Sequence, residues 1–247
     1  MCGITGLAAP RPVNENTVRK MTDLLAHRGP DDHGYWTSRD AKVCFGHRRL
    51  SIIDTSAAGR QPMVKGKTVI TYNGELYNYI ELRARLQADG ISFQSSSDTE
   101  VVLEAYRQWG PACLSEFNGM FAFAIYDEAQ ERLFCARDRF GEKPFLYSFN
   151  TDFFGFASEY KSLLNLEGIS REIDQLSLLR FLNNPSVGLD DSETTLFRSI
   201  SQLLPAHSLT LDLKSFELET RQYWAPEVDQ MLAAWIKRKS KASFVSS

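Results

Sequence analysis

The architecture predicted for this chain depends on its first six residues, Met1-Cys2-Gly3-Ile4-Thr5-Gly6. Removal of Met1 would make Cys2 the first residue and place a thiol and a free α-amine on the same residue. Because an α-amine has a pKa of about 7.7–8.0, part of it is unprotonated at neutral pH and can accept the thiol proton. Such a residue would supply both nucleophile and base. The alternative is a cysteine that only happens to follow the initiator, and this stretch alone leaves both open.

Composition restricts the classes of protein that remain. The chain has 247 residues, of which 43% are hydrophobic and 24% charged, so it can bury a full core as one large domain with at most a small appendage. A net charge of −3 gives no basic surface for nucleic acid. No apolar stretch approaches the ~18 residues of a membrane span, and the start does not resemble a signal peptide. We therefore expect a cytoplasmic protein with no nucleic-acid partner and no membrane association.

Cysteines and histidines predict neither disulfides nor a metal site. The cysteines are far apart and show no CxxC spacing: Cys2, Cys44, Cys113 and Cys135. The last three fit a buried core. His27, His33 and His47 lack metal-ligand spacing and are interpreted as structural histidines with satisfied hydrogen bonds.

Hydrophobic periodicity predicts a strand-rich domain with helices layered outside the strands. Expected strands span 42–45, 49–53, 68–72, 120–127, 132–137, 145–149 and 153–157. Expected helices span 14–25, 79–88 and 98–109. Residues 127–132 read as a hairpin connection between two of these strands.

The last third of the chain has a different pattern. It predicts a helix around 178–182, followed by two alternating runs at 207–213 and 216–223 that form an edge hairpin closing the domain. After Trp224, Ala225-Pro226 interrupts the pattern, and residues 227–235 are expected to form one short helix. The basic residues that follow, up to Ser247, are expected to be a solvated or disordered tail.

Two adjacent arginines, Arg48 and Arg49, lie beside an expected strand. Because side chains alternate along a strand, one of them must face inward, where its guanidinium can grip a carboxylate with two hydrogen bonds. A surface salt bridge is the alternative.

A second polar segment is Tyr72-Asn73-Gly74-Glu75. The spacing of Asn73-Gly74 first suggests a hairpin turn. The functional alternative is an oxyanion hole made by the Asn73 amide and the Gly74 backbone N–H, with glycine allowing close approach of substrate.

A third polar segment, Ser97-Asp98-Thr99-Glu100, opens an expected helix. Ser97 and Glu100 have the spacing of a capping box, which is a purely structural explanation. The Asp98 carboxylate could in addition bind the ammonium group of a substrate.

Together these segments resemble one family, the N-terminal glutaminase domains of glutamine-dependent asparagine synthetases, which are class II amidotransferases of the N-terminal-nucleophile hydrolase group. The matching motifs are Met1-Cys2-Gly3-Ile4, His27-Arg28-Gly29-Pro30-Asp31, Arg49-Leu50-Ser51-Ile52-Ile53-Asp54, Tyr72-Asn73-Gly74-Glu75-Leu76-Tyr77-Asn78, Ser97-Asp98-Thr99-Glu100 and Arg137-Asp138-Arg139-Phe140-Gly141-Glu142-Lys143-Pro144. They follow one another in the family's order up to about residue 165, and a weaker match continues to Trp224.

The resemblance implies a role for each matching residue. Cys2 would attack the side-chain amide of L-glutamine with its own α-amine as base, and Asn73 and Gly74 would form the oxyanion hole. Arg49 would hold the substrate α-carboxylate and Asp98 its α-ammonium. The rest of the pocket would be lined by Leu50, Ser51, Ile52, Ile53 and Glu75. The products would be glutamate and ammonia, the ammonia-donating half of asparagine synthesis from aspartate.

The resemblance also implies a fold and a domain boundary. The fold would be of the α+β class, a four-layer αββα sandwich of two mainly antiparallel sheets between helical layers, with the segment from Arg137 to Pro144 supporting the sheet packing. The amidotransferase domain would span residues 2–224. The proline-glycine-histidine usual before the closing strand is altered to Pro205-Ala206-His207.

The synthetase half of the family is not recognisable in this sequence. No Gly-Gly dipeptide occurs, so the pyrophosphate loop of that domain is missing. We therefore expect no cofactor in this chain, since ATP and magnesium would belong to the synthetase domain. An excised domain, a truncated gene product and a glutaminase subunit that serves a separate synthetase partner all fit, and a homodimer is left open. So are an ammonia donor for another acceptor and a non-catalytic domain.

Overall fold

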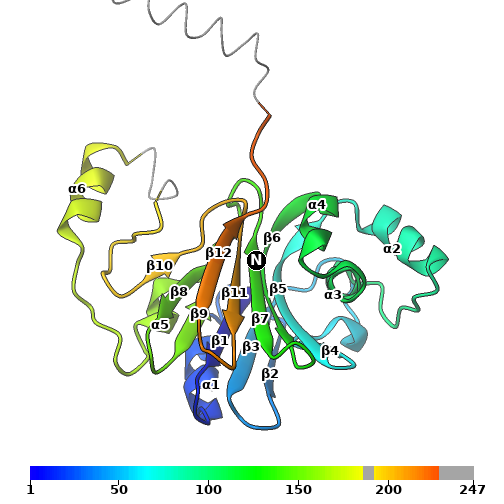
Figure 1. The fold of residues 1–247 in the computed structure, drawn as a ribbon, viewed down its shortest axis with the longest axis horizontal. Coiled ribbons are helices and arrows are strands. Elements are labelled where there is room, and N and C mark those ends of the chain that lie inside the picture. Colours follow the sequence, from blue (N-terminus) through cyan, green and yellow to red (C-terminus); the bar gives the residue numbers. More distant parts are fainter. Residues whose placement is uncertain (186–191, 228–247) are drawn as a thin grey trace, which may run out of the picture.

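The computed structural model describes residues 1–185 and 192–227, and within them two six-stranded sheets lie face to face (Figure 1). The first sheet runs in the order β10 (Ser201–Gln202), β8 (Leu146–Phe149), β9 (Phe154–Ala157), β1 (Gly3–Ala8), β3 (Val43–Arg49), β2 (Asp32–Thr37). The second runs in the order β12 (Leu218–Gln222), β11 (His207–Asp212), β7 (Arg132–Arg137), β6 (Gly119–Asp127), β5 (Thr68–Leu76), β4 (Met63–Lys65). Neighbouring strands pair antiparallel in both sheets.

Side chains point alternately to the two faces of each strand, and this alternation explains why the sheets stack. In β6, Phe121 and Phe123 face one side of the sheet, whereas Ala122 and Ala124 face the other and pack between the two sheets. Ile4 of β1 and other buried side chains of both sheets complete this inner core.

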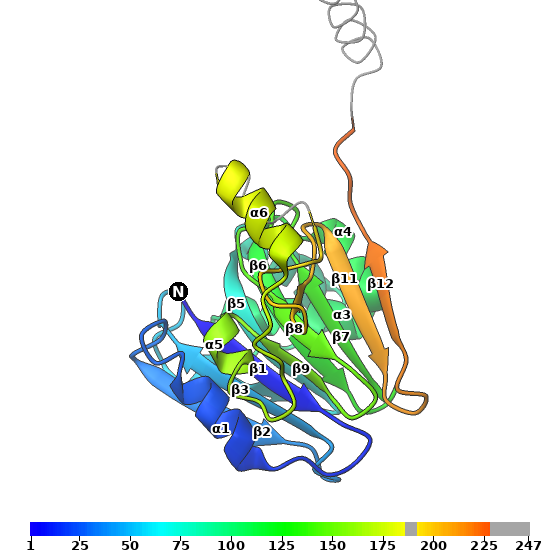
Figure 2. The ribbon, with the colours of Figure 1, turned by 90° about the vertical axis from the view of Figure 1, so that its left-hand side faces the viewer.

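Helices cover both outer faces (Figures 1 and 2). On the first sheet lie α1 (Glu15–Asp23) and α5 (Tyr160–Leu163), and on the second lie α2 (Tyr79–Ala88), α3 (Asp98–Trp109) and α4 (Cys113–Glu116). Two short 3₁₀ helices span Ala57–Gly59 and Gly110–Ala112. The predicted four-layer αββα sandwich of the α+β class is confirmed.

Local signals fix where the helices begin. Ser97 caps α3, because its hydroxyl accepts the Thr99 N–H at 3.0 Å. The predicted capping box is only half correct, since Glu100 accepts from the N–H groups of Gln94 and Ser95 and not from that of Ser97.

Two element predictions were wrong. Residues 42–45 and 49–53 do not form two strands: one strand, β3, ends at Arg49, and Leu50 to Ile53 form a loop. The ladder with β1 and β2 ends there, and the apolar Ile52 remains 59% exposed. Asn73-Gly74 is not a hairpin turn but lies inside β5, paired with β6.

Four strands escaped prediction for identifiable reasons. β1 contains two glycines, β2 is largely polar, β4 has only three residues and β10 only two. The strands β6, β7, β8, β9, β11 and β12 and the helices α1, α2 and α3 were predicted within two residues, as was the connection between β6 and β7. The strand predicted at 68–72 continues four residues further, to the end of β5 at Leu76.

The predicted final hairpin is confirmed: β11 and β12 pair, and β12 lies at the edge of its sheet. Ala206, which replaces the expected glycine before β11, adopts φ of 59°, in the left-handed region that favours glycine. The helix α6 (Gln175–Asn183) confirms the one predicted around 178–182. The helix and tail predicted after residue 227 lie outside the described residues.

Cys44, Cys113 and Cys135 are buried, as predicted. Within residues 1–185 and 192–227, no helix is both long and apolar enough to cross a membrane. The same residues contain no cluster of three or more histidine, cysteine or acidic side chains arranged to hold a metal ion.

Candidate functional site

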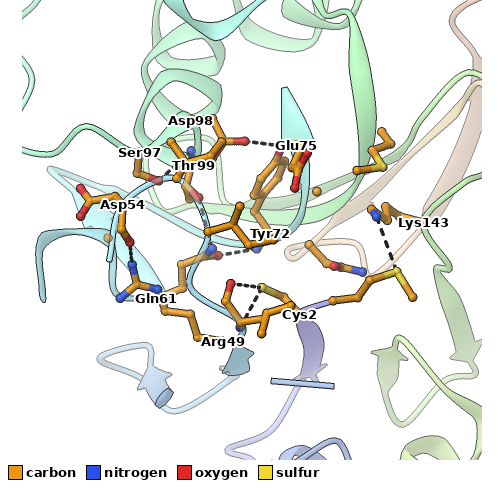
Figure 3. A pocket seen from close by; sticks show the side chains of 18 residues that line it. Cys2, Arg49, Asp54, Gln61, Tyr72, Glu75, Ser97, Asp98, Thr99 and Lys143 are labelled. Carbon is orange, nitrogen blue, oxygen red and sulfur yellow. Dashed lines mark hydrogen bonds between the residues drawn. The ribbon is translucent and has the colours of Figure 1, made fainter. Parts of the chain in front are cut away.

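A pocket lies at the end of the sandwich where β1 begins and β5 ends (Figure 3). Its volume is ≈ 160 Å³, close to the ~150 Å³ of a protein cavity that accepts benzene. It can therefore hold one small molecule. The side chains that reach it come from β1, the loop after β3, β5 and the start of α3.

Cys2 forms the floor of this pocket. Its Sγ accepts the Leu50 N–H at 3.4 Å and donates to the Leu50 carbonyl at 3.6 Å. Burial raises the pKa of the thiol above its usual range, and the Leu50 N–H, the N-terminal amine and Arg49 only partly oppose that effect. The thiol is therefore protonated at neutral pH and needs a base before it can react.

Backbone and side-chain contacts hold Cys2 in place. Arg28 donates through Nε to the Cys2 carbonyl at 2.9 Å and through Nη1 to Glu159 at 2.9 Å. Two residues further along the chain, the Ile4 N–H donates to the Ser158 hydroxyl and the Ser158 N–H donates to the Ile4 carbonyl, both at 3.0 Å. Although burial raises the pKa of Glu159, hydrogen bonds from Arg28, His27 and Lys161 lower it to about 2. Cys2 thus directly precedes a strand that these contacts anchor.

Asn73 carries an unused hydrogen-bond donor at the pocket wall. Its side chain is 1% exposed, and its Nδ2 has no partner among the described residues. Leaving a buried donor unpaired costs about 1–3 kcal/mol, so a ligand oxygen that accepts from Nδ2 would bind with a corresponding advantage.

The backbone N–H of Gly74 lies on the edge of β5 that faces away from β6. In β5 the ladder bonds to β6 fall on odd residues, since the Lys67 carbonyl accepts the Glu128 N–H and the Tyr77 N–H donates to the Asn118 carbonyl. Even residues therefore direct their N–H groups away from β6. The N–H of Tyr72 donates to Gln61 and that of Leu76 donates to Asp98, and the Gly74 N–H lies between them on the same edge.

The reason for glycine at position 74 differs from the one expected. A Cβ there would overlap the carbonyl oxygen of Met120 and lie 2.8 Å from Phe121 Cα. The close neighbour is thus the backbone of β6, and the absence of a side chain serves the pairing of β5 with β6.

Arg49 is the inward-facing arginine of the pair. It is 7% exposed, and its guanidinium donates to the carbonyls of Ser56, at 2.9 Å, and Asp54. Because a guanidinium has five N–H donors, three remain for a ligand. A Cβ on Gly59 would overlap Nη2, so the glycine makes room for the guanidinium.

Asp98 lines the opposite side of the pocket from the first turn of α3. Its Oδ2 accepts the Tyr72 hydroxyl at 2.9 Å and the Leu76 N–H at 3.0 Å. Burial raises the pKa of this carboxyl, while both hydrogen bonds oppose the effect. Burial together with the Asp98 charge raises the pKa of Tyr72 well above its usual range, so the hydroxyl stays a donor.

Nearly all predicted site residues meet in this one pocket. The wall includes Cys2, Arg49, Leu50, Ile52, Ile53, Asn73, Gly74, Glu75 and Asp98. Ser51 does not reach it, and its N–H donates to Asp31 at 2.8 Å.

Nine further residues of the wall were given no role in the site. Six of them lie within quoted motifs: Met1, Asp54, Tyr72, Ser97, Thr99 and Lys143. The other three, Gly59, Gln61 and Met120, lie outside the quoted motifs. Gln61 Oε1 accepts the Tyr72 N–H at 2.6 Å, a contact between distant residues that no local pattern reveals.

His47 also departs from its predicted role as a satisfied histidine. It is fully buried, and its Nδ1 contacts the Thr71 hydroxyl at 3.2 Å, but its Nε2 has no partner in the described part of the chain. Burial and the nearby Arg49 charge lower the pKa of His47 to about 3, so the ring is neutral.

The pocket therefore combines a thiol, two aligned N–H donors, a guanidinium and a carboxylate. The donors can stabilise an oxygen that becomes negative when a thiol attacks a carbonyl carbon. A cation and an anion on facing walls match an amino acid that carries a carboxylate and an ammonium.

Comparison with known proteins agrees with this description. The family model described as the glutamine amidotransferase domain matches residues 1–224. The glutamine-hydrolyzing asparagine synthetase 3 of Bacillus subtilis (strain 168) is 42% identical over 240 residues, covering 93% of this chain and 38% of the relative. Its asparagine synthetase 1 is 38% identical over 217 residues, covering 85% of this chain and 33% of the relative. The chain spans well under half the length of these relatives.

A solved structure supports the fold alone. The glutamine phosphoribosylpyrophosphate amidotransferase from Bacillus subtilis, complexed with ADP and GMP, superposes with a TM-score of 0.65 at 19% sequence identity. The match covers 91% of this chain and 50% of that one.

Proposed function

This chain belongs to the glutamine amidotransferase domain family, and we propose that its pocket hydrolyses L-glutamine to glutamate and ammonia through a thioester on Cys2. The observation that carries the proposal is the buried Nδ2 of Asn73, which has no partner among the described residues and lines the same pocket as the thiol. The removal of Met1 is part of the proposal, because it creates the α-amine that serves as base.

Substrate binding uses opposite charges on two walls. The N–H groups of Arg49 that the loop leaves unused bind the α-carboxylate of glutamine, and the Asp98 carboxylate binds its α-ammonium. Glu75 and the loop from Leu50 to Ile53 line the space between, with Ser51 supporting the loop through Asp31.

Acylation begins when the Cys2 α-amine takes the proton from Sγ, and the sulfur bonds to the side-chain carbonyl carbon of glutamine. The carbonyl oxygen becomes an oxyanion that accepts from Asn73 Nδ2 and the Gly74 N–H. As the intermediate collapses, the carbon–nitrogen bond breaks. The nitrogen leaves as ammonia after taking the proton that the Cys2 amine had accepted from Sγ.

Deacylation repeats these events with water. The α-amine takes a proton from water as the oxygen bonds to the thioester carbon, and the same two donors hold the oxyanion. The carbon–sulfur bond then breaks, the sulfur recovers its proton, and glutamate leaves. The steps use side chains and backbone of this chain, and we propose no cofactor for them.

The ammonia acceptor belongs to the same proposal. Because the relatives named above are glutamine-hydrolyzing asparagine synthetases, we propose that ammonia passes to a synthetase active site that converts aspartate to asparagine with ATP and magnesium. That site would lie in a separate subunit or in chain beyond the matched region. A cytoplasmic location fits this role.

Glutamate release from glutamine by the purified chain tests the function. We expect turnover in samples whose N-terminal mass shows removal of Met1, and none in Cys2→Ala. Asn16→Ala, at an exposed position of α1, is the control and retains turnover. Absence of turnover in the processed chain contradicts the proposal, whereas turnover that persists in Cys2→Ala contradicts the role of the thiol.

A further inference from the structure

We propose that Lys143 is a positioning residue whose ammonium charge sets the pH at which the amine and thiol of Cys2 become reactive. The inference rests on the proposed function, since it concerns the Cys2 amine that exists only after Met1 is removed. It adds a residue with no assigned role to the reactive pair.

The backbone of Lys143 is locked on both sides. Its N–H donates to Asp138 Oδ2 at 3.0 Å, and its carbonyl accepts Arg137 Nε at 2.8 Å. The side chain lines the pocket and is 6% exposed. It extends toward the start of the chain (Figure 3), where Nζ lies 3.5 Å from the thioether sulfur of Met1.

The thioether sulfur of Met1 is a poor partner for the buried ammonium of Lys143. A thioether sulfur is a weak acceptor, and burying an ammonium is unfavourable unless it is paired. Within residues 1–185 and 192–227, no carboxylate forms an ion pair with Lys143. Among the described residues, the ammonium of Lys143 therefore lies in the pocket wall without an ion-pair partner.

Removal of Met1 leaves this charge near the amine that becomes the new terminus. Five covalent bonds separate the Met1 sulfur from the Cys2 nitrogen, so Nζ lies within about 10 Å of that nitrogen. Loss of Met1 also takes away the thioether. The ammonium then faces the new terminus across the pocket.

Other charged groups also lie near Cys2, and the charge of Lys143 acts in addition to them. Arg49 donates to the loop carbonyls, Asp54 accepts from Ser56 and Ser96, and Asp98 accepts from Tyr72 and Leu76. Glu75 also lines the pocket, and behind Cys2 the charges of Arg28 and Glu159 are paired with each other. Glu142 and Asp138 flank Lys143 from its own loop, where Asp138 accepts backbone N–H groups.

A positive charge near the amine disfavours its protonated form and favours the thiolate. At a separation of about 10 Å and an effective dielectric constant of about 20, the effect is roughly one pKa unit. With Lys143 present, the free amine is thus available at a pH about one unit lower than without it.

The test measures alkylation of Cys2 by iodoacetamide against pH, with the modified peptide identified by mass. Samples are first treated with methionine aminopeptidase, and the processed terminus is verified. We expect the midpoint of the rate profile to rise by about one pH unit in Lys143→Met and Lys143→Gln. Lys143→Arg keeps the wild-type midpoint, because it restores the charge. Lys67→Met removes an exposed charge at the far end of β5 and serves as the matched control.

The outcomes separate this inference from the proposed function. Unchanged midpoints in both neutral variants, with melting temperatures like that of the wild type, overturn the role of Lys143. A shift that Lys143→Arg does not reverse also overturns it, since the charge would then not be the cause. Alkylation requires no glutamine, so a chain that alkylates with the predicted shift but releases no glutamate contradicts only the proposed function.

Discussion

The two walls of the pocket are built in different ways. One wall is the second half of β5, a nine-residue strand paired with β6 along its whole length, whose other edge is paired with β4 only from Thr68 to Ile70. The other is the loop from Leu50 to Ser56, held by the Arg49 guanidinium and by the contact of Ser51 with Asp31. The strand supplies the proposed oxyanion donors, and the loop surrounds the residue proposed to bind the substrate carboxylate. This division predicts that changes in the strand affect the chemical step, whereas changes in the loop affect binding.

The sharpest test of the strand wall is Asn73→Ala. The substitution removes one proposed oxyanion donor, and the loss of such a donor lowers kcat by roughly 10²- to 10³-fold. KM should change little, because the donor acts on charge that develops only in the transition state. Steady-state kinetics of glutamate release measure both constants. A rise in KM with kcat preserved would place Asn73 in ground-state binding and would remove the distinction between the walls.

Arg49→Lys tests the loop wall. A lysine cannot replace both the loop contacts and the forked grip on a carboxylate, and hydrogen bonds to charged groups contribute about 1.5–3 kcal/mol. We expect KM for glutamine to rise roughly 10- to 100-fold, with a smaller fall in kcat. The same kinetics measure it, and Arg19→Lys, on the exposed face of α1, is the control. A fall in kcat as large as that of Asn73→Ala would contradict the comparison.

Glycine-to-alanine substitutions compare the walls directly. In Gly74→Ala the new Cβ meets the backbone of β6, which cannot move without breaking the sheet, so we expect a loss of about 1–3 kcal/mol in the free energy of unfolding. In Gly59→Ala the closest atom is the end of the Arg49 side chain, which can shift. This variant should keep most of its stability and lose affinity for glutamine. Urea unfolding and KM for the two variants check the contrast, which fails if both lose equal stability.

The difference between the strand wall and the loop wall also explains which parts of the site could be predicted from the sequence. Cys2, Asn73 and Asp98 were found because each lies in a short motif within a regular element or next to one. The error at 49–53 arose because apolar residues followed Arg49 in a strand-like run, although the loop is shaped by long-range contacts that no periodicity encodes.

The conformation of Asn73-Gly74, in the strand wall, was predicted wrongly for a similar reason. Asn73-Gly74 has the composition of a turn, but pairing with β6 overrides that preference. Lys143 and Gln61 were missed because their role depends on contacts with Met1 and Tyr72, which lie far away in the sequence.

Asp54→Asn gives the smallest expected effect and tests whether the loop is a separable part of the fold. Although burial raises the pKa of Asp54, hydrogen bonds from the hydroxyl and N–H of Ser56 and from the Ser96 N–H lower it to about 2. Since this pKa lies below that of the unfolded chain, near 3.9, the carboxylate stabilises the fold above about pH 4. That contribution, about 2 kcal/mol, is lost as the pH falls from 4 to 2.

Urea unfolding of wild type and Asp54→Asn at pH 6 and pH 2.5 measures this contribution. We expect the wild type to be the more stable at pH 6 and the difference to shrink at pH 2.5, because protonation then removes the charge that the variant lacks at every pH. If the loop is separable, Asp54→Asn also raises KM while kcat stays close to that of the wild type, since the β5 donors are untouched. A pH-independent difference in stability would show that Asp54 acts through packing, and an equal loss of kcat would show that the two walls move as one.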